Sequence, residues 1–255
     1  MKITERQGKI LNSIVTDYIG LAQPISSEFL ENKHDFGICP ASIRIEMQKL
    51  TDKGFLSQPH TSAGRMPTDR GYRFFVDSLL DKGISDFEDV FEIEKMFKEE
   101  KEDILRFASH LSKFLAETSS NLATIHLPEK DFFFKEGWEE IFEEPEFKEQ
   151  NLIFGFTRLL ENFEKNIENL KVNSKSELPF MEKKGKKRTL SSSPIKVYIG
   201  KENPFSKSKD FSIISSKCIL PDEEQVIISL LGPKRMDYDR NISLINSLIQ
   251  ILEKL

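Results

Sequence analysis

Cysteine is scarce in this chain of 255 residues, which holds only Cys39 and Cys218. Two cysteines so far apart cannot build a disulfide framework, and they lack the close spacing of a metal-binding knuckle. The four histidines are scattered, and none stands in a metal-ligand pattern such as His-Glu-x-x-His. The twelve glycines are mostly solitary, so the sequence offers no glycine-rich loop for phosphate. We therefore expect no metal, no other cofactor and no enzymatic activity.

Long apolar runs are also missing. The first twenty residues do not contain the apolar stretch of a signal peptide, and the run at 226–231 is too short to cross a bilayer. Hydrophobic residues make up 38% of the chain and charged residues 31%, which is typical of a soluble protein with much exposed helix. We expect a cytoplasmic protein that does not contact membranes.

A strong basic charge is absent too. The net charge is −5, and residues 1–80 hold ten Lys and Arg against nine Asp and Glu. Such a balance does not favour tight, non-specific binding to nucleic acid. If the protein binds DNA, a few well-placed contacts must carry the binding, and dimerisation would double them.

Turn-forming residues are densest at 58–73, where two prolines, two glycines and four hydroxyl side chains occur. This segment is too polar and too interrupted to form a helix or a core strand, so it predicts a projecting hairpin. Its hydroxyl groups and cation suit a phosphate backbone or a groove edge. The residues that we expect to contact DNA backbone or minor groove from this hairpin are His60, Thr61, Ser62 and Arg65.

A helix is expected just before the hairpin, over residues 40–53, with Pro40 in its first turn. Ile43, Met47 and Leu50 form one apolar stripe along it. The opposite side carries the short, amide and cationic side chains that can read base edges in the major groove: Ala41, Ser42, Arg44, Gln48 and Lys49. Such a face is often merely solvated, but a glycine, a short strand and the hairpin follow it at once. This order predicts a winged helix.

Earlier helices complete that unit. A helix over residues 4–20 begins at the N-cap Thr4 and carries a broad apolar face. After Pro24, Ser26 or Ser27 caps a short helix that ends near residue 33. Thr68 caps a further helix over residues 69–80. Three helices followed by a hairpin are the order of a winged helix-turn-helix domain.

Three runs make the resemblance to a known family specific: Pro-Ala-Ser-Ile-Arg-Ile-Glu-Met at 40–47, Gly-Phe-Leu-Ser-Gln-Pro-His-Thr-Ser-Ala-Gly-Arg-Met-Pro-Thr at 54–68, and Gly-Tyr-Arg at 71–73. Residues 1–82 closely resemble the DNA-binding head of the heat-inducible transcription repressor HrcA family. Shorter segments at 134–147, 199–203 and 232–238 are similar to the same family. The resemblance implies a homodimeric repressor of chaperone operons that binds a CIRCE-type inverted repeat in double-stranded DNA. It also implies the GroE chaperonin as a modulator.

The remaining chain predicts an α+β regulatory domain. Residues 83–122 are expected to form a helical connector or dimerisation region. Residues 123–255 are expected to form a reduced GAF-like antiparallel sheet domain with flanking helices, and the basic stretch near 173–194 to be a disordered loop. Strands are predicted over 195–199, 211–219 and 225–231, and a short buried strand at the three phenylalanines 132–134. Usual family members are longer, with an inserted dimerising segment between the connector helices and the phenylalanine-rich strand, whereas in this chain only a few residues separate Asn121 from Glu129.

Two other functions fit the same features. The sheet domain could bind a small molecule and gate a regulator of another operon. The winged helix could also be a protein-interaction or RNA-interaction module, which the near-neutral charge of residues 1–80 allows. For the repressor we expect Ser42, Arg44, Gln48 and Lys49 to lie in the major groove.

Overall fold

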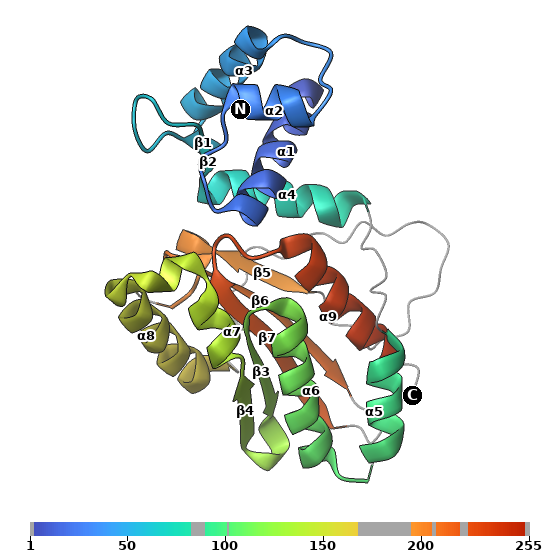
Figure 1. Cartoon of the computed structure of the whole chain (residues 1–255). Helices are drawn as coiled ribbons and strands as arrows, with labels where there is room; N and C mark the ends of the chain where they lie inside the picture. The colour runs from blue at the N-terminus through green and yellow to red at the C-terminus, as the bar shows by residue number, and fades with distance from the viewer. Residues whose placement is uncertain are drawn as a thin grey trace. The chain divides into compact units, whose positions relative to one another are not determined.

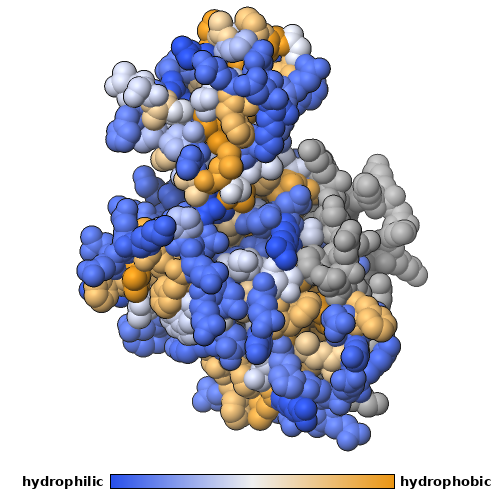
Figure 2. Space-filling model, viewed as in Figure 1, coloured by the Kyte–Doolittle hydropathy of each residue, from blue (hydrophilic) through white to orange (hydrophobic). Residues whose placement is uncertain are grey.

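The computed structural model describes residues 3–82, 90–100, 102–167, 195–205, 208–219 and 224–252. The chain divides into two compact units, Met1–Gly83 and Ile84–Leu255, which we call the head and the sheet unit (Figure 1). The expected basic loop at 173–194 lies outside the described residues. On the face shown in Figure 2, hydrophilic residues cover most of the described surface, and hydrophobic residues form small groups between them.

The head has the order of elements that the sequence predicts. Its elements are α1 (Glu5–Leu21), α2 (Ser27–Lys33), α3 (Pro40–Asp52), β1 (Leu56–Ser57), β2 (Met66–Pro67) and α4 (Asp69–Lys82). The strands β1 and β2 pair antiparallel and form the base of the wing. Its apolar core contains Ile10, Leu11, Ile14, Val15, Ile25, Leu30, Ile43, Met47, Leu50, Phe55, Leu56, Tyr72, Phe75 and Val76.

Polar side chains cap the helices of the head where the sequence indicates. Thr4 accepts from the backbone N–H of Gln7, whose side chain in turn accepts from the N–H of Thr4, which makes a capping box. Ser26 accepts from the N–H of Phe29 at 3.1 Å. Thr68 accepts from the N–H of Gly71 at 3.2 Å. These caps satisfy amides that would otherwise have no partner inside the helix.

The sheet unit is an antiparallel sheet with helices on both faces, and the predicted α+β class is confirmed. Its strands are β3 (Leu122–Leu127), β4 (Phe132–Glu136), β5 (Lys196–Ile199), β6 (Phe211–Ile219) and β7 (Gln225–Pro233), in the order β4-β3-β7-β6-β5. Its helices are α5 (Val90–Glu100), α6 (Ile104–Ser119), α7 (Trp138–Glu143), α8 (Gln150–Asn166) and α9 (Tyr238–Leu252), with short 3-10 turns at Pro128–Lys130, Pro145–Lys148 and Gly200–Glu202.

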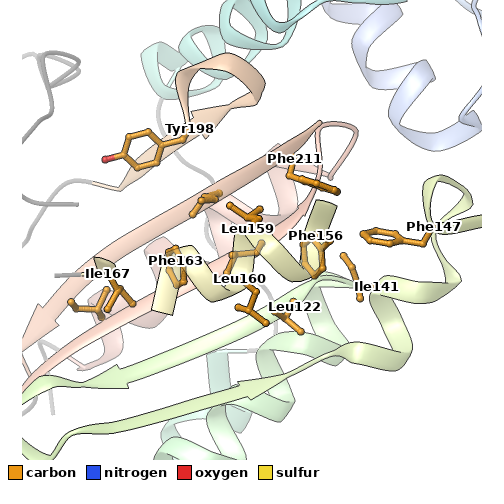
Figure 3. Close-up of a cluster of buried hydrophobic side chains, with 13 residues drawn as sticks. Leu122, Ile141, Phe147, Phe156, Leu159, Leu160, Phe163, Ile167, Tyr198 and Phe211 are labelled. Carbon is orange, nitrogen blue, oxygen red and sulfur yellow. The ribbon is translucent and has the colours of Figure 1, made fainter. Parts of the chain in front are cut away.

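Alternate residues of the strands face two different layers. Phe211, Ile213 and Leu231 pack against α8, where Phe156 and Phe163 complete an aromatic core (Figure 3). The residues between them face α6 and α9, which pack on β3 and β6, with α5 against both helices (Figure 1). The helices α5 and α6 thus fall within the expected connector of 83–122 and pack as part of the sheet unit. The expected three-part division of the chain stays a prediction.

The sheet differs from the prediction in two ways. Residues 122–127, for which the sequence predicted no strand, form β3, a strand with all six residues buried. It lies between β4 and β7, and a strand covered on both faces shows no alternation of polar and apolar residues. The predicted strand at the three phenylalanines exists as β4, but it is an edge strand, and Phe132 is 45% exposed. Aromatic content alone does not distinguish an edge strand from a central one.

Candidate nucleic-acid interface

The helix α3 presents an open face to solvent. Ile43, Met47 and Leu50 are buried in the head core, as the stripe predicted. Of the expected groove residues, Arg44, Gln48 and Lys49 are exposed, whereas Ser42 is half-buried. We call Ala41, Arg44, Ile45, Gln48 and Lys49 the exposed face of α3.

Ile45 is the member of this face that the sequence prediction missed, and it is 55% exposed. The sequence prediction names only short, amide and cationic side chains on this face and omits Ile45. Its position was readable from the sequence, because it lies on the opposite side of the helix from the apolar stripe.

At the start of α3, Ser42 is held by the residue that precedes the helix. Its hydroxyl lies 3.4 Å from the Sγ of Cys39, and its N–H donates to the Cys39 carbonyl at 2.9 Å. The hydrogen bond from Ser42 lowers the pKa of the Cys39 thiol from its ordinary value. Ser42 therefore has a local partner in addition to any groove contact.

Lys49 is paired on the other flank of the exposed face. Its Nζ lies 2.8 Å from Oε1 of Glu46, whose other oxygen accepts from Nε2 of Gln7 at 2.7 Å. The hydrogen bonds from Lys49 and Gln7 lower the pKa of Glu46. Glu46 thus stays ionised at neutral pH and partly neutralises the cation beside it.

The wing loop between β1 and β2 is braced from inside. Nε2 of Gln58 donates to the carbonyls of Thr61 and Ala63, both at 2.9 Å, and the N–H of Ala63 donates to the carbonyl of His60. The side chain of Gln58 therefore provides a hydrogen-bond donor for two backbone carbonyls of the wing loop. His60, Thr61 and Ser62 are exposed at this tip, as a projecting hairpin predicts.

The base of the wing is tied to the segment before α2. Ile25 and Arg65 form an antiparallel bridge, with N–H to carbonyl distances of 2.9 and 2.8 Å. A Cβ atom at Gly64 would lie 2.3 Å from the carbonyl oxygen of Ile25, so only glycine permits this approach.

The side chain of Arg65 is turned inward, which differs from the free wing cation expected from the sequence. The residue is 9% exposed. Its Nε donates to Oγ1 of Thr51 at 3.0 Å, and its Nη2 donates to Oε1 of Gln48 at 2.8 Å. Arg65 therefore joins the wing to α3 by side-chain hydrogen bonds. Sequence spacing gave no sign of this, because the partners lie 14 and 17 residues away.

Gln48 is held at both ends of its amide. Oε1 accepts from Arg65, and Nε2 donates to Oδ1 of Asp52 at 2.8 Å. These two partners set which end of the amide carries the oxygen. By contrast, Arg44 is exposed and has no hydrogen bond or ion pair to any described residue.

Within the described residues there is no group of three or more His, Cys, Asp or Glu that could hold a metal ion. In the same part of the chain, no helix has the length and apolar character needed to cross a membrane.

The sequence pattern of the family described as "HrcA protein C terminal domain" matches residues 69–242. A heat-inducible transcription repressor HrcA from Desulfitobacterium hafniense is 43% identical over 132 residues, which cover 51% of this chain and 38% of the relative. One with the same name from Natranaerobius thermophilus is 27% identical over 341 residues, covering 100% of this chain and 98% of the relative. Because 341 aligned positions accommodate only 255 residues, this chain is the shorter of the two.

A crystal structure described as that of a hypothetical protein at 2.2 Å resolution superposes on this chain with a TM-score of 0.71. It is 20% identical and covers 99% of this chain and 98% of its own, so it supports the fold alone. The family pattern covers more than half of the sequence. The chain therefore belongs to the HrcA family of heat-inducible transcription repressors, a family of DNA-binding regulators and not of enzymes.

Proposed function

We propose that the protein represses chaperone genes by binding, as a homodimer, to a CIRCE-type inverted repeat in double-stranded DNA. The observation that carries the proposal is the hydrogen bond between Arg65 and Gln48, which joins the base of the wing to the exposed face of α3. Contacts of this kind, with the hydrogen bond from Arg65 to Thr51, support a fixed relation between a helix that would enter the major groove and a wing that would follow the adjacent backbone.

In the groove we assign direct base contacts to Arg44 and Gln48, because Arg bonds guanine and Gln bonds adenine bidentately. Lys49 and Ser42 lie on the other flank, where phosphates are closer. At the wing tip, the exposed His60, Thr61 and Ser62 contact the DNA backbone or the minor groove. All of these side chains are polar, and all are exposed except Ser42, which is half-buried.

Gln48 can read adenine without leaving its present partners. Its Oε1 has two lone pairs and its Nε2 has two hydrogens, and Arg65 and Asp52 use one of each. The remaining acceptor and donor match N6–H and N7 of adenine. We therefore assign Arg65 a positioning role through Gln48, in place of direct contact with phosphate.

The weak net charge of the head favours a dimer as the form that binds DNA. One head with ten basic and nine acidic residues in 1–80 gains little from counterion release. Two heads related by a two-fold axis would bind the two half-sites of an inverted repeat together. Control by the GroE chaperonin is part of the proposal, and its support is the family membership.

The test is fluorescence anisotropy with the full chain on three duplexes: the CIRCE-type repeat, a single half-site, and a scrambled repeat of equal composition. The full repeat should bind at least tenfold more tightly than the half-site, and the addition of GroE should strengthen binding further. Equal binding to the repeat and the scrambled duplex would contradict the repressor function. If both half-site and repeat bind alike but more tightly than the scramble, the homodimer is wrong and the operator is right.

A further inference from the structure

An apolar side chain stands at the centre of the exposed face of α3. Ile43, Met47 and Leu50 point into the head core. At about 100° per residue, Ile45 lies opposite their mean direction to within roughly 15°. Among the described residues of the head, only Leu21 and Ile45 are large, apolar and exposed. Single exposed apolar residues are common, so the position of Ile45 matters more than its exposure.

The neighbours of Ile45 on the exposed face of α3 are apolar along the helix axis and polar on either side of it. Ala41, one turn earlier, is also exposed, and the two form a short apolar strip. Arg44 and Gln48 flank the strip on the side of the wing, where Gln48 meets Arg65. Lys49 flanks it on the side of Glu46 and Gln7. The face is thus apolar along its middle and polar on both margins.

This order matches a cross-section of the major groove. When a helix lies in the groove, the middle of its exposed face approaches the base edges, and its margins approach the polar edges and phosphates of the two strands. The one apolar group that a base pair presents there is the C5-methyl group of thymine. The free energy of binding becomes more favourable when such a group covers an isoleucine that is exposed to solvent.

We propose that Ile45 contacts the C5-methyl group of a thymine in each half-site and that Ala41 extends this apolar contact. Ile45 is then a specificity-determining residue that favours a T·A pair over a C·G pair at its position. The inference rests on the proposed function and adds a base identity to it.

Replacement of thymine by deoxyuridine removes only the methyl group and leaves base pairing intact. The experiment uses CIRCE-type duplexes in which one thymine of a half-site and its symmetry mate are both replaced by deoxyuridine, each position in turn. We expect wild-type affinity to fall about fourfold per half-site at one or two positions, the cost of one unburied methyl group. Ile45→Ala should bind the thymine and uracil duplexes equally at those positions, and Ile45→Val should retain part of the difference.

Two controls separate the possible results. Leu21→Ala removes the other large, exposed apolar side chain among the described residues of the head and should keep the wild-type response to uracil. Uracil in the spacer should have no effect. If Ile45→Ala responds to uracil as the wild type does, or if the wild type does not respond to uracil, the thymine contact is wrong. Selective binding to the repeat would in that case still support the repressor function. A wild type that does not distinguish the repeat from a scrambled duplex would remove the repressor function, and the thymine contact with it.

Discussion

Nη2 of Arg65 donates to Oε1 of Gln48 at 2.8 Å, which connects the base of the wing to the exposed face of α3. The same guanidinium donates to Thr51 at 3.0 Å. Because a planar guanidinium offers donors in fixed directions, the contact orients the amide of Gln48 as well as holding it. Under the proposed function, Arg65 therefore acts on base reading through Gln48, from a buried position.

Replacement of Arg65 should alter base preference. We expect Arg65→Ala to weaken discrimination at the base pair that Gln48 reads, by up to the roughly 1 to 3 kcal/mol of a bidentate contact. Competition binding against duplexes changed at each half-site position would measure it. Gln48→Ala and the double variant complete the cycle, and the two losses should not add, because both act through one contact.

Arg65→Lys separates positioning from charge. A lysine keeps the cation but cannot supply the fork that reaches both Gln48 and Thr51. We expect Arg65→Lys to behave like Arg65→Ala in base preference. Full recovery by lysine, with a uniform change over all duplexes, would instead indicate a phosphate contact, as first expected from the sequence.

Arg44 should contribute both charge and sequence preference. We expect Arg44→Ala to cost about 1 to 3 kcal/mol of discrimination at one base pair. Arg158→Ala, which removes an exposed arginine from α8 of the sheet unit, is the matched control and should leave binding unchanged. Anisotropy titrations of both variants on the repeat would measure the difference, and equal effects of the two would remove Arg44 from the groove.

The ion pair with Glu46 should reduce the contribution of Lys49 to DNA binding. The pKa of Glu46 is lowered in the folded head, so its ion pair is present at neutral pH and is lost only in acid, as pH falls through that lowered value. We expect Glu46→Gln to strengthen binding to any duplex and to steepen the salt dependence by up to about one unit of slope. Glu117→Gln, which breaks an exposed pair with Lys113 in α6, serves as control. A slope unchanged by Glu46→Gln would mean that Lys49 does not meet phosphate.

Gly64 should be irreplaceable at the base of the wing. A methyl group there would lie 2.3 Å from the carbonyl of Ile25, so we expect Gly64→Ala to destabilise the head by about 1 to 3 kcal/mol. At Gly20, near the end of α1, nothing lies within 4 Å of an added Cβ. There Gly20→Ala should stabilise the head by about 0.5 to 1 kcal/mol. Hydrogen exchange of peptides from α1 and the wing would show both shifts, and similar protection in the two variants would refute the close contact.

In the sheet unit, Arg235 holds two carboxylates. Its Nε donates to Glu146 at 2.8 Å and its Nη2 donates to Glu144. Burial by itself lowers the pKa of Arg235, but hydrogen bonds and charge from Glu146 and Glu144 raise it overall, so the guanidinium stays charged. We expect Arg235→Ala to lower the free energy of unfolding by about 2 kcal/mol, since two partly buried carboxylates lose their partner. Urea unfolding followed by the fluorescence of Trp138, the one tryptophan of the chain, measures this change.

The exposed arginine Arg158 is again the control, and its removal should change the unfolding free energy by less than about 0.5 kcal/mol. Near Arg235, the Oδ1 of Asp237 accepts from the N–H of Arg240 at the start of α9, a contact between close neighbours in the chain. The guanidinium of Arg235, by contrast, binds Glu144 and Glu146, which lie some 90 residues earlier.

The sequence by itself determined the local structure of this protein. Caps at Thr4, Ser26 and Thr68, the apolar stripe of α3 and the turn residues of the wing act over a few residues, and the structure contains them where they were predicted. The three runs at 40–47, 54–68 and 71–73 also indicated the family. Signals of this kind survive in a sequence because each depends only on near neighbours.

Tertiary structure alone decided what depends on distant partners. The strand β3 is an interior strand because β4 and β7 pair with its two edges. The sequence of its six buried residues does not indicate which strands pair with it. The side chain of Arg65 is buried against α3 because Gln48 and Thr51 accept its hydrogen bonds. In both cases the deciding contact joins residues far apart in the chain, and only the folded molecule shows it.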